Sequence, residues 1–187
     1  MRLSLNSVTN RDLRKLGVPN LPSEDAALEA LRAAERRYPD LALPEPGYAY
    51  LACGMTHGAR DVPWLERLRD AAVNAGLRLY DPRQSRLGPK LREEWPELSD
   101  SSVALYDYLI VSGASVVVLD ATHPSFGAAH EAMHALRCGV YVLAVADGPC
   151  SPFLRAHYDV VTSATACEVI ARCAPLLSNR AVGVNRG

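Results

Sequence analysis

The clearest fold signal in the sequence is SVVVLDATHPSFGAAHEAMHALRCGVYVLAVA, residues 115–146. It begins and ends with short apolar runs, 115–119 and 140–145, which are rich in β-branched residues and too short for surface helices. The segment between them, 127–138, has helical spacing of its apolar residues and is followed by Gly139, a residue type that commonly ends helices. A strand, a helix and a second strand in this order predict a right-handed parallel βαβ unit.

The same alternation continues over most of the chain after Gly47. The expected strands are 48–53, 77–80, 115–119, 140–145 and 159–162. The expected helices are 62–75, 98–112, 127–138 and 164–177, with Gly76, Gly113 and Gly139 as C-terminal caps and Asp61 and Ser163 as N-caps. We therefore predict an α/β fold with a doubly wound, flavodoxin- or Rossmann-like five-stranded parallel sheet and helices on both faces.

Residues 1–47 differ from the rest of the chain. An amphipathic stretch, 23–38, lies between proline-containing segments and begins with Ser23 as a possible N-cap. We expect a helical N-terminal extension at 1–47 that serves for packing, followed by one α/β domain at 48–187.

Composition limits the function classes. The chain has 187 residues, of which 49% are hydrophobic and 22% charged, and its formal net charge is −1. These values indicate a folded domain and argue against a nucleic-acid partner. The apolar runs are too short to cross a membrane, and the first ten residues have no signal-peptide core, so we expect a soluble, cytoplasmic protein. The five cysteines form no CxxC pair, which argues against a zinc ribbon or a disulfide framework.

Two predicted helices each direct one carboxylate toward the protein. Glu131 shares a helical stripe with Ala128, and Asp107 shares one with Val103. A carboxylate in such a position is costly without a partner or a function. Two of them together suit glycosidic chemistry, in which one carboxylate attacks a sugar carbon and the other handles protons.

The alternative interpretation of Asp107 is structural. In that case it forms an ion pair with an arginine such as Arg83 or Arg92. The pattern alone leaves both interpretations open.

Two loops indicate an anion site beside these carboxylates. Residues 123–127 run directly into a predicted helix, so that the Ser125 hydroxyl, the Gly127 amide and the positive end of the helix dipole converge. The loop 54–60 after the first strand offers glycines, a hydroxyl and a guanidinium across the expected crevice. The candidate binding residues in these loops are Gly54, Thr56, His57, Gly58, Arg60, Ser125 and Gly127.

The segment 106–131 resembles the nucleoside 2-deoxyribosyltransferase superfamily, most closely its 2′-deoxynucleoside 5′-phosphate N-hydrolase branch. The shared pattern is an Asp on a helix, a hydrophobic strand, Thr-x-Pro-Ser-x-Gly and then Glu. Here it is formed by Asp107, residues 116–118, Thr122-His123-Pro124-Ser125-Phe126-Gly127 and Glu131. The resemblance extends over about residues 48–173.

The resemblance implies a homodimeric enzyme that hydrolyses the base–sugar bond of a nucleoside 5′-monophosphate without metal or organic cofactor. It implies Glu131 as nucleophile, Asp107 as proton-handling partner and Ser125 with Gly127 as phosphate contacts. It also adds Tyr50 to the binding residues, and Ser151 as a residue that approaches the ligand of a neighbouring subunit. An exposed helix start is an equally good interpretation of Ser151.

Three other functions compete with the hydrolase. A second nucleobase as acceptor would make the protein a nucleoside 2-deoxyribosyltransferase, and loss of turnover would leave a nucleotide-binding module. His130-Glu131-Ala132-Met133-His134 also matches HExxH, in which two histidines bind zinc and the glutamate activates water. We expect both histidines on the solvent face, and no third ligand stands at the usual spacing, so the zinc hypothesis ranks below the glycosidase.

Overall fold

A computed structural model describes residues 5–19, 21, 23–39, 42–54, 62–123 and 125–182, and it confirms the predicted α/β fold. The strands are β1 (Ala49–Ala52), β2 (Leu79–Tyr80), β3 (Val116–Asp120), β4 (Tyr141–Ala146) and β5 (Asp159–Thr162). The α-helices are α1 (Asn10–Lys15), α2 (Glu24–Arg37), α3 (Val62–Asn74), α4 (Leu87–Glu94), α5 (Ser99–Gly113), α6 (Phe126–Arg137), α7 (Pro152–His157) and α8 (Ala166–Val182). Short 3₁₀ turns lie at Leu5–Ser7, Pro82–Gln84 and Pro96–Leu98.

All five strands are parallel, in the order β2-β1-β3-β4-β5. Tyr50 pairs with Val117, and Val118 pairs with Leu143. Every residue of β1 and β3 is buried because helices cover both faces of the sheet. The strand order reverses between β1 and β3, so the ligand crevice of such a sheet is expected at their carboxyl ends.

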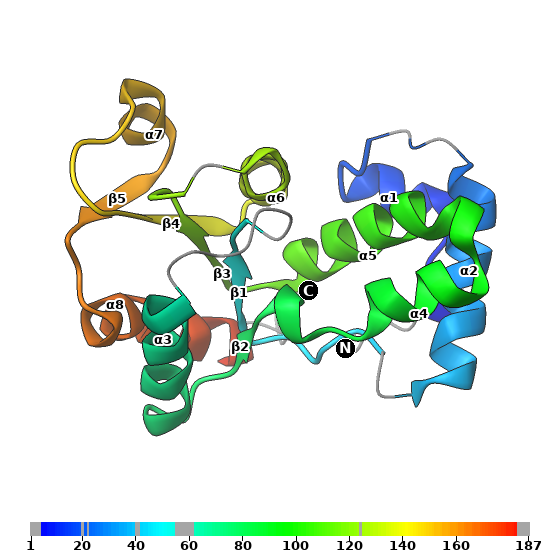
Figure 1. The fold of residues 1–187 in the computed structure, drawn as a ribbon, viewed down its shortest axis with the longest axis horizontal. Coiled ribbons are helices and arrows are strands. Elements are labelled where there is room, and N and C mark those ends of the chain that lie inside the picture. The colour runs from blue at the N-terminus through cyan, green and yellow to red at the C-terminus, as the bar shows by residue number, and fades with distance from the viewer. Residues whose placement is uncertain are drawn as a thin grey trace.

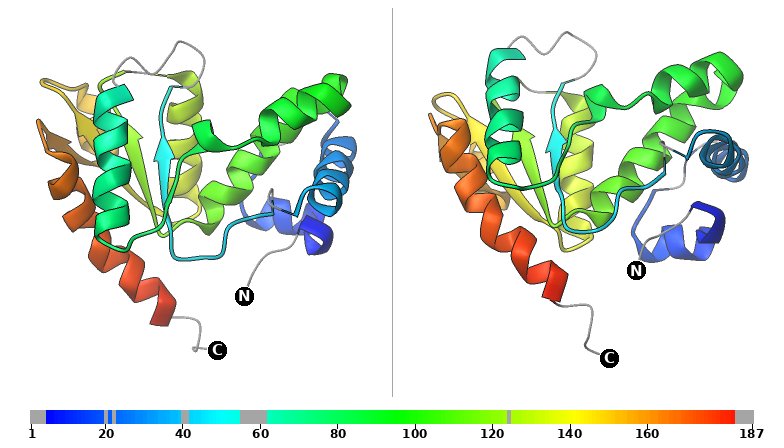
Figure 2. Two further views of the ribbon diagram at one scale, coloured as in Figure 1. Left: turned by 60° about the horizontal axis from the view of Figure 1, so that its bottom comes forward. Right: turned by 90° about the horizontal axis from the view of Figure 1, so that it is seen from below.

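The helices form two layers around the sheet and a third layer beyond one of them. Helices α3 and α8 cover one face, whereas α5 and α6 cover the other, as the views in Figures 1 and 2 show. Helices α1, α2 and α4 lie on the outer side of α5, away from the sheet (Figure 2). The chain ends its described part with α8, which runs past the edge of the sheet.

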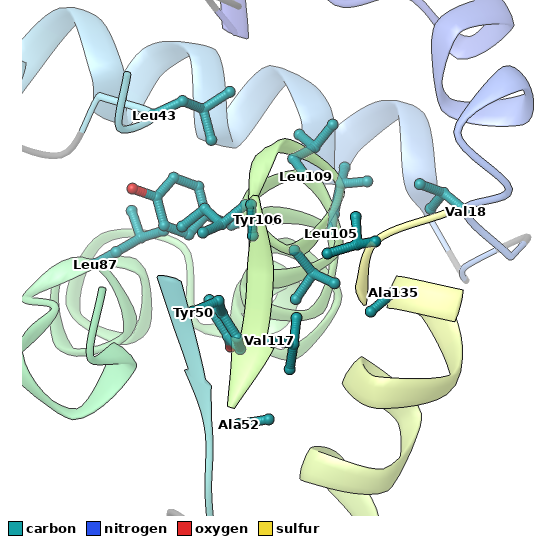
Figure 3. Packing of buried hydrophobic residues seen from close by; sticks show 14 of the residues in the cluster. Val18, Leu43, Tyr50, Ala52, Leu87, Leu105, Tyr106, Leu109, Val117 and Ala135 are labelled. Carbon is teal, nitrogen blue, oxygen red and sulfur yellow. The ribbon is translucent and has the colours of Figure 1, made fainter. Parts of the chain in front are cut away.

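The N-terminal extension packs against α5 and shares its core, as Figure 3 shows for Val18 and Leu43. The apolar stripe of α2, which includes Leu28 and Leu31, is buried there, as its helical spacing predicted.

The contact between α2 and α4 is polar. Glu94 on α4 accepts hydrogen bonds from Arg37 (2.9 Å) and from the hydroxyl of Tyr38, which follows α2, so the two helices are joined.

Several helix ends differ from the prediction. Gly76 and Gly139 have the positive φ of a C-terminal cap (+68° each), but Gly113 is helical. Gly113 is required for space instead, since a Cβ there would lie 2.9 Å from the hydroxyl of Tyr48. Ser163 does not cap α8.

Thr165 caps α8 in place of Ser163. It forms a reciprocal pair of hydrogen bonds with Glu168, from the Thr165 amide to Oε2 (2.7 Å) and from the Glu168 amide to the threonine hydroxyl (3.3 Å). The third expected cap, Asp61, lies outside the described residues. Within the described ranges, no helix combines the length and apolar character that a membrane span requires.

Candidate active site

A pocket of about 390 Å³ opens where the carboxyl end of β1 meets α4, α5 and α6. It lies beside the point between β1 and β3 where the strand order reverses. Both predicted carboxylates, Asp107 from α5 and Glu131 from α6, line it. The structure therefore brings together two residues that lie 24 positions apart in the sequence.

Glu131 is held in the wall of the pocket by the packing of α6. The small residues Ala128, Ala132 and Ala135 on the same helix are buried against the sheet and α5, which lets the helix approach closely. Glu131 Oε2 is buried and has no hydrogen-bond partner of good geometry among the described residues. Burial, with the nearby charge of Asp107, raises the pKa of Glu131 to about 8.

Asp107 has a similar environment on α5. Burial raises the pKa of its carboxyl group to about 7. The ion pair considered from the sequence does not form, because Arg83 pairs with Asp81 instead (Nη2 to Oδ2, 2.6 Å). No ion pair of Asp107 is present in the part of the chain that the structure describes.

Tyr50 is not among the residues that line the pocket. Its ring is fully buried and stacks on Tyr80, with ring centroids 5.8 Å apart (Figure 3 shows Tyr50 between β1 and β3). The Tyr50 hydroxyl lowers the pKa of Glu131, opposing burial, because a donor favours the ionised carboxylate. Tyr50 is therefore placed to act on the glutamate, and its contact with a ligand stays a prediction.

The N-terminus of α6 forms part of the pocket wall. Ser125 is the N-cap, and its hydroxyl accepts a hydrogen bond from the Ala128 amide (3.5 Å). Ser125 and Gly127 both line the pocket. Gly54, which follows β1, is so close that a Cβ there would lie 3.5 Å from Ser125 Cβ. The predicted anion site at the start of α6 thus faces the same cavity as the two carboxylates.

The loop that carries Ser125 is shaped by Asp120, which the sequence analysis did not single out. Its buried carboxylate accepts hydrogen bonds from the amides of Thr122 (3.0 Å) and His123 (3.4 Å). An Asp directly after a buried strand is a typical signal for such a turn.

The remaining predicted binding residues either lie outside the described part of the chain or do not line the pocket. Thr56, His57, Gly58 and Arg60 lie outside the described residues. Ser151 is the exposed N-cap of α7, where its hydroxyl accepts from the Phe153 amide (3.2 Å), and it does not line the pocket.

The histidines of the HExxH match face different surroundings, and the prediction that both lie on the solvent face is wrong. His130 is exposed, but His134 is only 2% exposed and its Nε2 lies 2.9 Å from the Ser112 hydroxyl. The reason is that α6 packs against α5 as well as against the sheet, so residues of α6 outside its apolar stripe are also buried. Among the described residues, no three His, Cys, Asp or Glu side chains are grouped as metal ligands.

One wall of the pocket was not predicted at all. Helix α4 contributes Leu87, Gly88, Pro89 and Arg92 to the lining. Its first turn contains glycine and proline, which suggest a loop in the sequence, although proline is tolerated in the first turn of a helix.

No protein-family model matches this chain, and no curated protein is significantly similar to it.

Proposed function

We propose that this protein is an N-glycosidase that hydrolyses the base–sugar bond of a nucleoside 5′-monophosphate. One observation carries the proposal. Two half-buried carboxyl groups from different helices, Asp107 and Glu131, line one pocket beside the N-terminus of α6, and both have a raised pKa. This combination supplies a nucleophile, a proton carrier and an anion site within one cavity.

The raised pKa values suit a pair that holds one proton. With both groups protonated there is no nucleophile, and with both ionised there is no acid. The singly protonated pair contains one of each. Because the pKa of Glu131 is the higher of the two, the resting proton lies on the glutamate, and the reactive form, in which Glu131 is ionised and Asp107 is protonated, requires the proton to move between them. The Tyr50 hydroxyl lowers the cost of that form, since it favours the ionised Glu131.

In the first step, the Glu131 carboxylate attacks C1′ of the sugar. A C1′–O bond forms, the C1′–N bond breaks and its electron pair leaves with the base. Asp107 donates its proton to the departing base, which leaves as a neutral molecule. The sugar phosphate remains bound to Glu131 as an ester.

In the second step, Asp107 acts as a base. Its carboxylate takes a proton from a water molecule while the water oxygen attacks C1′, and the bond to Glu131 breaks. The products are the sugar 5-phosphate and an enzyme restored to its starting protonation state. No metal or organic cofactor takes part in either step.

The phosphate is proposed to bind at the start of α6. The unpaired amides and the positive end of the helix dipole favour an anion there, and Ser125 and Gly127 line the same cavity as the carboxylates. Binding energy from this remote group can hold C1′ against Glu131.

The test is turnover of a panel of ribo- and deoxyribonucleoside 5′-monophosphates, with free base measured by chromatography. We expect base release from at least one monophosphate, much slower release from the matching nucleoside and none with Glu131→Gln. Addition of a second nucleobase distinguishes the related transferase, which would form a new nucleotide in place of free sugar phosphate. Absence of base release from the whole panel would overturn the proposal.

A further inference from the structure

We infer that the N-terminal extension takes part in the function of the pocket, because Tyr38 and Glu94 are positioning residues that hold α4 in place as one of its walls. This inference rests on the proposed function and names what keeps the same site in shape. It assigns the extension a role beyond packing, and it assigns a role to a helix that the sequence analysis did not predict.

Helix α4 depends on its neighbours for its position. It has only eight residues, and Gly88 and Pro89 lie in its first turn, so its intrinsic helical stability is low. Its buried side chains, Leu87 and Leu91, attach it to the core. Its pocket side, which includes Gly88, Pro89 and Arg92, faces the cavity instead. A contact at the end of α4 is therefore needed to fix how closely this side approaches the cavity.

The C-terminal end of α4 is bound to the extension. Glu94, the last residue of α4, accepts hydrogen bonds from the Tyr38 hydroxyl and from Arg37 Nη1 (2.9 Å), and we call these three residues the clasp. Only 15% of the Glu94 side chain is exposed. Lys90, one turn earlier, lies over the Tyr38 ring, 5.4 Å from its centroid. A carboxylate at the last residue of a helix opposes the helix dipole, so Glu94 destabilises α4 by itself and becomes favourable through the clasp.

The extension is itself fixed to α5, the helix that carries Asp107. The apolar stripe of α2 is buried against α5, and the Ser102 hydroxyl on α5 donates to the carbonyl oxygen of Ala27 on α2 (3.4 Å). Figure 1 shows that both α4 and α5 reach α2. Because α2 contacts both helices, the clasp sets the position of α4 relative to Asp107.

The α4 wall limits the hydration of Asp107. Burial alone raises the pKa of this carboxyl group, and α4 lines the same pocket. Release of the clasp would let α4 move outward and admit water, which lowers the pKa of Asp107 toward its ordinary value. The same movement would loosen the contact of the wall with a substrate, which would then bind less tightly.

The titratable and charged groups near Asp107 belong to the pocket and the sheet and not to the clasp. Among the described residues they are Arg92 from α4, Glu131 from α6, Tyr106 and Tyr108 from α5, Tyr50 from β1, Tyr80 from β2 and Cys53 after β1. Tyr38→Phe changes none of them, alters no charge and keeps the ring beside Lys90. A shift in the pKa of Asp107 in this variant therefore reports the position of the α4 wall.

The experiment compares Tyr38→Phe, Glu94→Ala and the double variant with the unaltered protein, using hydrolysis of the best monophosphate. We expect Tyr38→Phe to raise KM by about 3- to 10-fold, the range for one lost hydrogen bond, and to move the pH optimum to a lower value. The double variant should be no worse than Glu94→Ala, because both substitutions break the same bond.

The matched control is Glu24→Gln. It weakens the ion pair between Glu24 and Arg14 (2.5 Å), which lies inside the extension at the opposite end of α2 from the clasp. This variant should leave KM and the pH optimum unchanged. An equal rise of KM with Glu24→Gln would overturn the inference. So would a loss of rate with Tyr38→Phe that is the same at every pH and leaves KM unchanged, since that result shows only reduced stability.

Two further measurements do not depend on turnover. Hydrogen exchange followed by mass spectrometry should show faster exchange of the α4 amides in Tyr38→Phe, with α2 and α5 unchanged. NMR titration of the carboxyl groups should show a lower pKa of Asp107 in the same variant. If both stay as in the unaltered protein, the inference is wrong even where nucleotides are hydrolysed. If both change but no nucleotide releases its base, the clasp holds the pocket wall as inferred and only the proposed function fails.

Discussion

The two faces of the sheet are built from neighbouring residues but have different chemistry. Side chains alternate along a strand, so Tyr50 points to the face covered by α5 and α6, and Leu51 points to the face covered by α3 and α8. The α3–α8 face is a cluster of aliphatic side chains and two thiols. The α5–α6 face adjoins the half-buried Asp107 and Glu131 and the buried His134.

The two faces differ in what they contribute, because one mainly stabilises the fold and the other holds the polar groups of the candidate site. On the α3–α8 face every buried side chain gains free energy simply by leaving water. On the α5–α6 face, Glu131 Oε2, the Tyr50 hydroxyl and His134 Nδ1 are buried without hydrogen-bond partners of good geometry among the described residues. Such groups lower stability, and proteins retain them most often where they have a function.

The largest expected effect is on the α5–α6 face. Glu131→Gln keeps the shape of the side chain but removes the proposed nucleophile, so base release should fall at least about 10⁴-fold. Asp107→Asn should lower it less, by about 10²- to 10⁴-fold, which is the usual contribution of a proton-transfer group. Steady-state kinetics and mass spectrometry of the glycosyl-enzyme provide the measurement. A larger loss with Asp107→Asn, or an adduct on Asp107, would exchange the two roles.

Next in size is a substitution on the opposite face. Leu68 on α3 is fully buried, and Leu68→Ala should lower the free energy of unfolding by about 2–5 kcal/mol because it leaves a cavity. Urea denaturation measures this loss. The kcat of the folded variant should stay within about 3-fold of the unaltered protein, since α3 contributes nothing to the described lining of the pocket. A specific loss of kcat without unfolding would contradict the separation of the two faces.

The same contrast shows what the sequence could predict. Apolar periodicity located the five strands and the helices that cover them, because burial of apolar side chains determines both. The inward direction of Asp107 and Glu131 also followed from helical spacing. In contrast, α4 was missed because Gly88 and Pro89 weaken the helical pattern, and α1 because it has only six residues.

The side chains of the polar face were harder to predict. The buried position of His134 depends on where α5 crosses α6, and that packing is not encoded in the pattern of α6 alone. The sequence also could not show whether Arg83 or Arg92 would approach Asp107; Arg83 pairs with Asp81, two residues before it, and Arg92 lines the pocket. Local patterns thus predicted the elements and their inward faces, whereas partners from distant segments required the three-dimensional structure.

The pH dependence of stability should come from the carboxylate pair. In the folded state burial raises the pKa of Asp107 from 3.8 to about 7 and that of Glu131 from 4.5 to about 8. Protons therefore bind the folded state more tightly, and the stability this provides is complete below about pH 4 and is lost as the pH rises through these higher values. The unaltered protein should lose stability from pH 4 to pH 8.

Glu131→Gln removes one of the two groups. At pH 9 it should be more stable than the unaltered protein by roughly 2–3 kcal/mol, and at pH 4 the difference should nearly vanish. Thermal denaturation across this range tests the prediction, with Glu97→Gln as the exposed control. A constant difference at all pH values would show that the glutamate does not titrate with a raised pKa.

The smallest effect concerns the histidines of α6 and separates the glycosidase from a zinc hydrolase. His134→Ala should lower the free energy of unfolding by about 1–2 kcal/mol, because the ring fills space beside Tyr108 (centroids 4.6 Å apart) and contacts the Ser112 hydroxyl. The exposed His130 should be replaceable by alanine within about 0.5 kcal/mol. A chelator should change neither stability nor turnover. Stoichiometric zinc in the purified protein, lost with either substitution, would instead make the two histidines ligands and move the chemistry of Glu131 from sugar attack to water activation.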